Sequence, residues 1–350
     1  MRKLSLLLIL ITLISCDSDN ETPNTVDFDK SSMLEAYADE YIIPYYSDLN
    51  ESIQLLKSSW GIYKSDRNAS NYDELMNSLK AVYNSWQYVG MLNFGPAANN
   101  HFFEFEFNIY PCDTNQIFSN IESGNWNLDA GANLSAKGLP ALDFLFSKTD
   151  PEMSESFIQY IDDLIIRMEN ISESNLNDWQ SSYRSTFISN SSNDRSSSFS
   201  LLINTLNKYY ERDLRDGKLG IPLGVRSLGE AQPERIEAKY SGFSDELLST
   251  SITAYELLYT NGDKLGIDDY IIAIGDNYMN GELDQKIKSQ FASIRNEMNS
   301  LNNSIDILVI ENSQEMNSLY TEIQKMIPLM KVDIPSATGV LITYQDNDGD

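Results

Sequence analysis

Long runs of apolar residues at three- and four-residue spacings restrict this chain to a fold made mainly of helices. One such run covers residues 33–63 and another covers residues 72–92. This spacing places the apolar side chains on one face of an α-helix. Pro44 lies inside the first run, where its missing N–H predicts a kink. Similar runs predict further helices at 135–147, 153–170, 175–189, 196–216, 243–260, 281–303 and 306–331.

These helices predict an all-α fold of two helical-bundle halves, because long antiparallel helices with short loops pack as bundles. A Ser- and Asn-rich segment near residues 190–196 indicates the boundary between the halves, which would then cover residues 31–190 and 191–350. The same segment is also compatible with a single loop inside one domain. Residues 216–235 contain several Gly and Pro residues, and we expect them to form a long ordered connection.

Two stretches depart from the helical pattern. In residues 101–112, Phe103, Phe105 and Phe107 alternate with glutamates, which predicts a short extended segment. Near the C-terminus, residues 340–344 form a short β-like run. Both stretches are minor additions to a helical fold.

The composition limits the class of partner. The formal net charge is −27, and a surface this acidic repels the phosphates of nucleic acids. We therefore expect no nucleic-acid partner. Hydrophobic residues make up 41% of the chain, which is enough to build a sizeable core.

The first residues predict export. A basic start, MRK, precedes an apolar stretch that ends in LISC, with Cys16 after a small residue. This ending resembles the lipobox of bacterial lipoproteins, which implies a signal peptide over 1–15 and acylation of Cys16. The alternative is an ordinary secretory signal. Residues 16–30 would then form a flexible tether, and the chain would be lipid-anchored in the bacterial cell envelope, at the outer membrane.

Few side chains are available for nucleophilic or metal chemistry. Cys112 is the only cysteine after Cys16, so no internal disulfide is expected in the mature chain. His101 is the only histidine, so we expect neither a Ser–His–Asp triad nor a His-rich metal site. His101 and Glu104 spell H-x-x-E, a weak metal candidate. On an extended segment their side chains would point to opposite faces.

Four ordered stretches together resemble the imelysin-like family. They are SWQYVGMLNFGPA (85–97), KGLPALDFLF (137–146), KLGIPLGVRSLGEAQPERIEAKYSG (218–242) and LITYQDNDGD (341–350). The resemblance implies two bundle-like halves and export to the cell envelope. The family is classified among metallopeptidases, and some members are tied to iron regulation or uptake.

The chain departs from the family's fuller metal signature, G-x-H-x-x-E. Gly138 is kept, but Pro140 occupies the histidine position and Asp143 the glutamate position. A catalytic zinc site takes about three protein ligands, and this segment offers one carboxylate. Three interpretations remain open: a helix start with a core stripe, a ligand-cleft role for Asp143, or a working metal site. Pro140 suits the first turn of a helix.

A cleft between the two halves is the default binding site. Its candidate residues are Gly138, Pro140, Asp143, Phe94, Gly95, Pro96 and Arg226. Arg226 either holds an anion or forms a salt bridge. The ending DNDGD (346–350) is compatible with a solvated terminus or a weak cation site.

Three functions follow as hypotheses. The first is a non-catalytic envelope binding protein, linked to the acquisition of iron or another divalent metal. Its partners would be the membrane, a small ligand or metal, and an envelope protein. The second is a metallopeptidase, and the third is a structural or surface-interaction protein. The cofactor is left open by the sequence.

Overall fold

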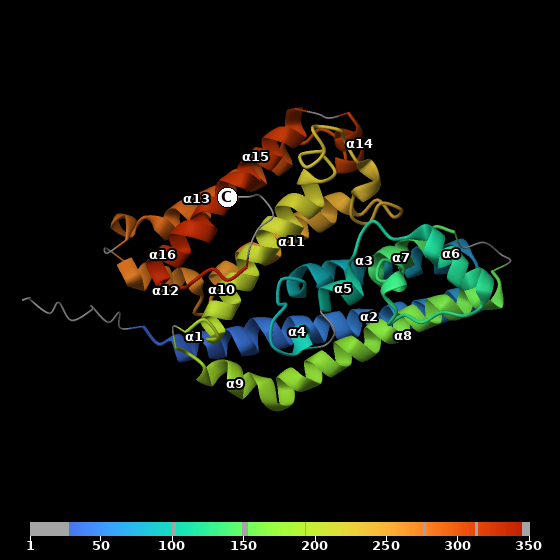
Figure 1. Cartoon of the computed structure of the whole chain (residues 1–350), viewed down its shortest axis with the longest axis horizontal. Coiled ribbons are helices and arrows are strands. Elements are labelled where there is room, and N and C mark those ends of the chain that lie inside the picture. Colours follow the sequence, from blue (N-terminus) through green and yellow to red (C-terminus); the bar gives the residue numbers. More distant parts are fainter. Residues whose placement is uncertain are drawn as a thin grey trace, which may run out of the picture.

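The computed structural model describes residues 28–99, 103–148, 153–192, 194–275, 278–311 and 314–344. Within these ranges the chain is helical and contains no β-strand, as the apolar spacing predicted. None of the helices in these ranges is both long and apolar enough to cross a membrane. Figure 1 shows two groups of helices, one from each part of the chain.

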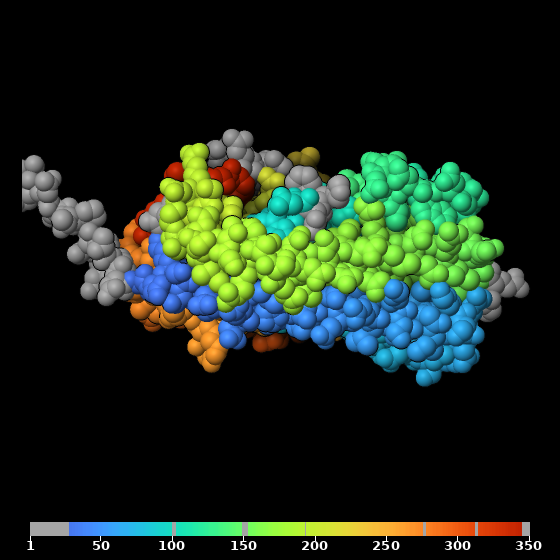
Figure 2. All heavy atoms as spheres, turned by 90° about the horizontal axis from the view of Figure 1, so that it is seen from below, coloured from blue at the N-terminus to red at the C-terminus, as the bar shows by residue number. Residues whose placement is uncertain are grey.

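The first group is built around three long helices. Helix α2 (Ile43–Ser65) packs against both α3 (Ala69–Val89) and α8 (Glu155–Asp178). Figure 2 turns the molecule to the face on which α2 and α8 lie side by side. The other elements of this group are α1 (Lys30–Ala36), α4 (Pro96–Asn99), α5 (Phe103–Phe107), α6 (Thr114–Ser123), η2 (Gly131–Asn133), α7 (Gly138–Phe146) and α9 (Arg184–Ser189).

The second group contains α10 (Ser198–Tyr209), α11 (Ser244–Thr260), α13 (Leu283–Asn299) and α15 (Gln314–Pro328). Helix α13 packs against α15, as Figure 1 also shows. The smaller elements are η5 (Pro233–Arg235), α12 (Ile267–Ile274), η7 (Met279–Gly281), α14 (Ile305–Ile310) and α16 (Ile334–Thr338).

Wider π-helical turns interrupt several helices. They are η1 (Tyr37–Ile42), η3 (Trp179–Tyr183), η4 (Tyr210–Gly220) and η8 (Leu329–Asp333). Pro44 lies in the first turn of α2, directly after η1. Because proline lacks an N–H, the chain changes its hydrogen-bonding pattern just before it. The predicted kink is thus accommodated by a π-helical segment.

Tyrosine hydroxyls of η1 join the two groups of helices by bonding to α11 and to the start of α12. The Tyr37 hydroxyl donates to the Leu258 carbonyl at 2.7 Å and accepts from the Ile267 N–H at 2.9 Å. The Tyr41 hydroxyl lies 3.2 Å from the Ala254 carbonyl. Burying these rings contributes apolar contact while each hydroxyl keeps a partner.

The extended segment predicted for residues 101–112 is wrong over Phe103–Phe107, which form helix α5, whereas residues 108–112 lie outside any helix. Phe103 and Phe107 are four residues apart and both are buried against Trp86, whereas Phe105 is exposed. Alternating phenylalanines fit this pattern because positions i and i+4 also share a helix face.

The predicted β-like run at 340–344 is also not a strand. It lies instead along α10 as an irregular segment. The Asn204 side chain donates to the Leu341 carbonyl at 3.0 Å and accepts from the Thr343 N–H at 2.6 Å.

Candidate functional site

The segment that resembles the metal signature is buried in helix α7. Gly138 has a φ of +75°, and a Cβ there would lie 2.5 Å from the Phe107 carbonyl oxygen. Only glycine therefore fits between α7 and the end of α5. Pro140 lies in the first turn of α7, where no N–H is required. Both residues have a structural reason to be where they are.

Asp143 is enclosed by protein, with 1% of its surface exposed. Its Oδ2 accepts the Tyr240 N–H at 3.0 Å, which ties α7 to the segment before α11. Its Oδ1 has no hydrogen-bond partner among the described residues. Burial raises the pKa of the Asp143 carboxyl to about 6.

The residues around Asp143 do not fit a catalytic metal. Pro140 offers no side-chain ligand, and burial raises the pKa of the nearby Cys112 thiol to about 12. A protonated thiol is a poor metal ligand. In the described parts of the chain, no three His, Cys, Asp or Glu side chains come together to hold an ion. The donor set here is a single carboxylate.

The other predicted cleft residues have partners of their own. Phe94 is buried against the rings of Trp179 and Phe187. Gly95 has a φ of +58°, and a Cβ there would meet the Tyr183 ring at 2.3 Å. Pro96 is buried at the start of α4. The surroundings of this segment are those of a packed core.

Arg226 forms a salt bridge, which is one of the two roles considered for it. Its Nη2 lies 2.6 Å from the Asp216 carboxylate. Glu104, on α5, pairs with Lys208 at 3.1 Å. His101, Cys16 and residues 346–350 lie outside the described residues.

A small cavity does exist between the two groups of helices. Its volume is about 30 Å³, enough for a water-sized guest. We call it the α5–η4 cavity. It is lined by Trp86, Gly90, Glu104, Asn108, Tyr110, Tyr209, Asp213 and Lys218.

The π-helical form of η4 explains how this element supplies two charged groups to the cavity. Asp213 and Lys218 are five residues apart and both line the α5–η4 cavity. A π-helix bonds residue i to residue i+5, so such a pair lies on one side. In an α-helix the same two residues would diverge. The wider π-helical turn therefore brings both side chains to the same cavity.

Lys218 is buried and fully engaged. Its Nζ forms an ion pair with Glu237 and donates to the Gln87 Oε1 at 2.8 Å. Glu237 Oε1 also accepts from Asn108 at 2.7 Å and from Gln87 at 3.2 Å. Gln87 and Asn108 belong to the first group of helices and Lys218 to the second. This network fixes one wall of the α5–η4 cavity.

Asp213 lines the cavity, and its carboxylate is exposed to solvent. Partial loss of hydration next to the protein raises the pKa of the Asp213 carboxyl above its ordinary value. The nearby Glu104 carboxylate raises the pKa further, because two like charges oppose each other. Lys208, which pairs with Glu104, and Lys218 partly oppose this rise.

The candidate residues chosen from the sequence did not include Asp213, Lys218 or Glu237. The sequence contained one indication of these two buried charges, because Lys218 and Glu237 lie at the two ends of a stretch of mostly apolar and glycine residues. Their burial depends on contacts with Gln87, about 130 and 150 residues away in the sequence.

This fold and this site define a class of protein: an all-α protein with a charged cavity between two groups of helices. The chain belongs to the imelysin family, because the model for that family, which carries a peptidase name, matches residues 42–327. No curated protein matches the chain.

Two solved structures share the fold. An imelysin-like protein from Psychrobacter arcticum 273-4 has a TM-score of 0.73 and 15% identity, covering 91% of this chain and 99% of its own. A structure described as an iron-regulated protein A precursor from Parabacteroides distasonis ATCC 8503 has a TM-score of 0.74 and 16% identity. The match covers 89% of this chain and 95% of that one. At this identity the likeness establishes the fold alone.

Proposed function

We propose that the protein is a non-catalytic binding protein whose site is the α5–η4 cavity. The observation that carries the proposal is Asp213, a solvent-accessible carboxylate beside Glu104 in a cavity whose lysine is already paired. The donor set around Asp143 argues against a peptidase centre in α7. A purely structural role would not require a charged concave site between the two groups of helices.

The ligand we propose is a bare metal cation, because the α5–η4 cavity holds only a water-sized guest. Carboxylate oxygens are the ligands that hard cations prefer. A net charge of −27 also concentrates cations near the protein and disfavours nucleic acid. One structural neighbour is named as iron-regulated, which supports a link to iron acquisition.

We further propose that the chain acts in the bacterial cell envelope. Acylation of Cys16 after removal of residues 1–15 would anchor it to the outer membrane, with residues 16–30 as a tether. The units 31–190 and 191–350 would then present the cavity between them. An envelope protein that receives the ligand would be its partner.

Metal stoichiometry tests this function. The full chain, purified in detergent, is dialysed separately against iron(II) without oxygen, iron(III), zinc and calcium, and bound metal is read by elemental analysis. We expect one equivalent of iron, with affinity at least tenfold weaker in Asp213→Asn. The Asp143→Asn variant is the matched control, because Asp143 is a buried acid outside the cavity.

Each outcome separates the hypotheses. No bound metal, or binding unchanged in Asp213→Asn, would rule out the α5–η4 cavity as the metal site. Binding lost only in Asp143→Asn would place the metal in α7. Chelator-sensitive proteolysis by the pure protein would then support the peptidase.

A further inference from the structure

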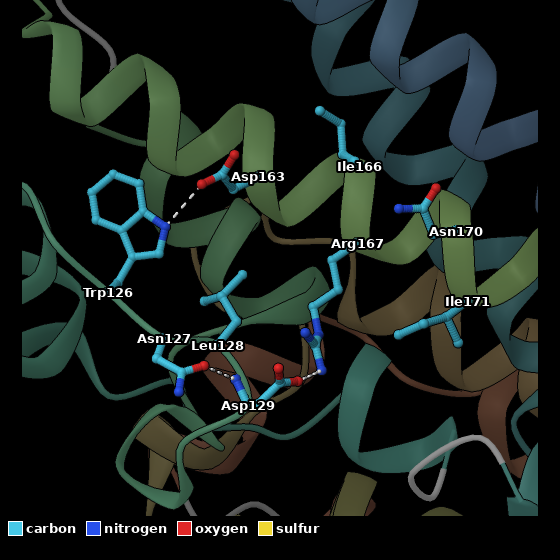
Figure 3. Close-up of a pocket in the computed structure, with 9 residues that line it drawn as sticks. All are labelled: Trp126, Asn127, Leu128, Asp129, Asp163, Ile166, Arg167, Asn170 and Ile171. Carbon is cyan, nitrogen blue, oxygen red and sulfur yellow. Dashed lines mark hydrogen bonds and ion pairs between the residues drawn. The ribbon is translucent and has the colours of Figure 1, made fainter.

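Another pocket lies on the side of helix α8, away from the α5–η4 cavity. Figure 3 shows that it forms between the loop carrying Trp126–Asp129 and one face of α8. Its volume is about 560 Å³, within the usual range for small-molecule sites. Ile166 and Ile171 provide an apolar wall on the α8 side. We call it the α8 pocket.

The aromatic group of the α8 pocket is held in a fixed orientation. The Trp126 Nε1 donates to the Asp163 carboxylate at 2.9 Å, as the dashed line in Figure 3 shows. The indole also packs perpendicular to the Tyr160 ring, with centroids 5.0 Å apart. Trp126 is only partly buried, so part of its ring faces the pocket. A fixed indole loses little entropy when a ligand packs on it.

The cationic group of the pocket is fixed as well. The Arg167 Nε donates to Glu106 at 2.6 Å, and its Nη2 donates to Asp129 at 2.7 Å. Glu106 is buried and also pairs with Lys137 at 2.6 Å. Among the described residues, the Arg167 Nη1 has no hydrogen-bond partner. This N–H group remains available to a ligand.

The charge balance of the α8 pocket disfavours an anionic ligand. Arg167 and Lys137 are opposed by three carboxylates, those of Glu106, Asp129 and Asp163. A further anion would meet a net negative site. The polar groups that point to the pocket are therefore suited to a ligand rich in neutral hydroxyls, because the carboxylates accept and the Arg167 N–H groups donate.

We propose that the α8 pocket binds a neutral saccharide. The C–H face of a sugar ring packs on an indole, and its hydroxyls bond to planar polar side chains at the rim. Trp126 supplies the indole, and Asp129, Arg167 and the exposed amide of Asn170 supply the polar groups. Asn127 is already engaged through its Oδ1 with the Asp129 N–H at 3.0 Å, which orders the rim.

Titration calorimetry on the full chain in detergent tests this site, with maltose, cellobiose and di-N-acetylchitobiose as separate probes. We expect at least one of them to bind with a Kd below 10 mM. Asp129→Ala is expected to weaken binding at least tenfold, and Trp126→Ala to abolish it. The Asp129 side chain is 74% exposed and Glu106 still holds Arg167, so Asp129→Ala should fold normally. Glu173→Ala, an exposed acid on α8, is the matched control and should bind as the unaltered chain.

A Kd above 10 mM for all three disaccharides would overturn the proposal. So would binding that Asp129→Ala and Trp126→Ala leave intact. A lysine-rich peptide serves as a competing probe. If it bound with strong salt dependence and the sugars did not, the α8 pocket would be a cation site instead.

Discussion

Asp143 is an acid whose proton is held more tightly in the folded chain than in the unfolded one. Its carboxyl pKa is about 6 when buried, against an ordinary value of 3.8. Its contribution to stability is therefore complete below about pH 4 and is lost as the pH rises through about 6. After burial, the charge of Asp306 makes a smaller contribution to the rise of this pKa.

The variant Asp143→Asn should remove this dependence. Relative to the variant, the unaltered chain should lose on the order of 2 kcal/mol of unfolding free energy between pH 4 and pH 7. Urea unfolding at both pH values measures it. Asp263→Asn, on an exposed loop, is the control. A difference between variant and unaltered chain that is the same at both pH values would contradict this account.

The buried pair of Lys218 and Glu237 is also testable residue by residue. Lys218→Met leaves Glu237 buried with only neutral amide partners, which should cost about 3 kcal/mol or more in unfolding free energy. Adding Glu237→Gln removes the unpaired charge, so the double variant should recover a large part of the loss. Urea unfolding of the single and double variants gives the coupling energy. Strictly additive effects would show that the two charges do not interact.

At the scale of the elements, the close approach of α7 to α5 depends on Gly138. In Gly138→Ala, the Cβ would collide with the Phe107 carbonyl and the positive φ would be strained, costing about 2 kcal/mol of stability. Gly61→Ala is the matched control, because Gly61 lies in α2 with open space around it. That change should stabilise by about 0.5–1 kcal/mol. Thermal unfolding tests this, because Gly138→Ala should lower the melting temperature and Gly61→Ala should raise it.

Helix positions followed well from the sequence, but local helix type did not. Apolar spacing of three and four predicts a helical run, yet a π-helical turn keeps the same residues and only shifts the hydrogen bonds. The extra width of η4 is what brings Asp213 and Lys218 to one cavity. For α5, phenylalanines at every second position are compatible with a strand or a short helix. The packing of Phe103 and Phe107 on Trp86 favours the helix.

At the scale of the whole molecule, the all-α class and the family were accessible from the sequence, whereas the surroundings of the candidate residues were not. The predicted cleft residues were chosen by motif, and Phe94, Gly95 and Asp143 proved to be packed in the interior. The α5–η4 cavity and the α8 pocket both depend on pairs far apart in the chain. One residue of the α8 pocket could have been noticed in the sequence, because Arg167 is the single basic residue in the 24 residues of α8.

The tyrosine bonds between the helix groups also bear on how a ligand would reach the cavity. Tyr37 and Tyr41 hold α11 and the start of α12 to the first helices, and the Tyr41 hydroxyl also donates to the carbonyl of Tyr88, the residue after Gln87. Opening the two groups like a hinge would expose these buried hydroxyls and their carbonyl partners, which is costly. Recognition would then proceed with little domain closure. The free and bound forms would then have nearly the same shape.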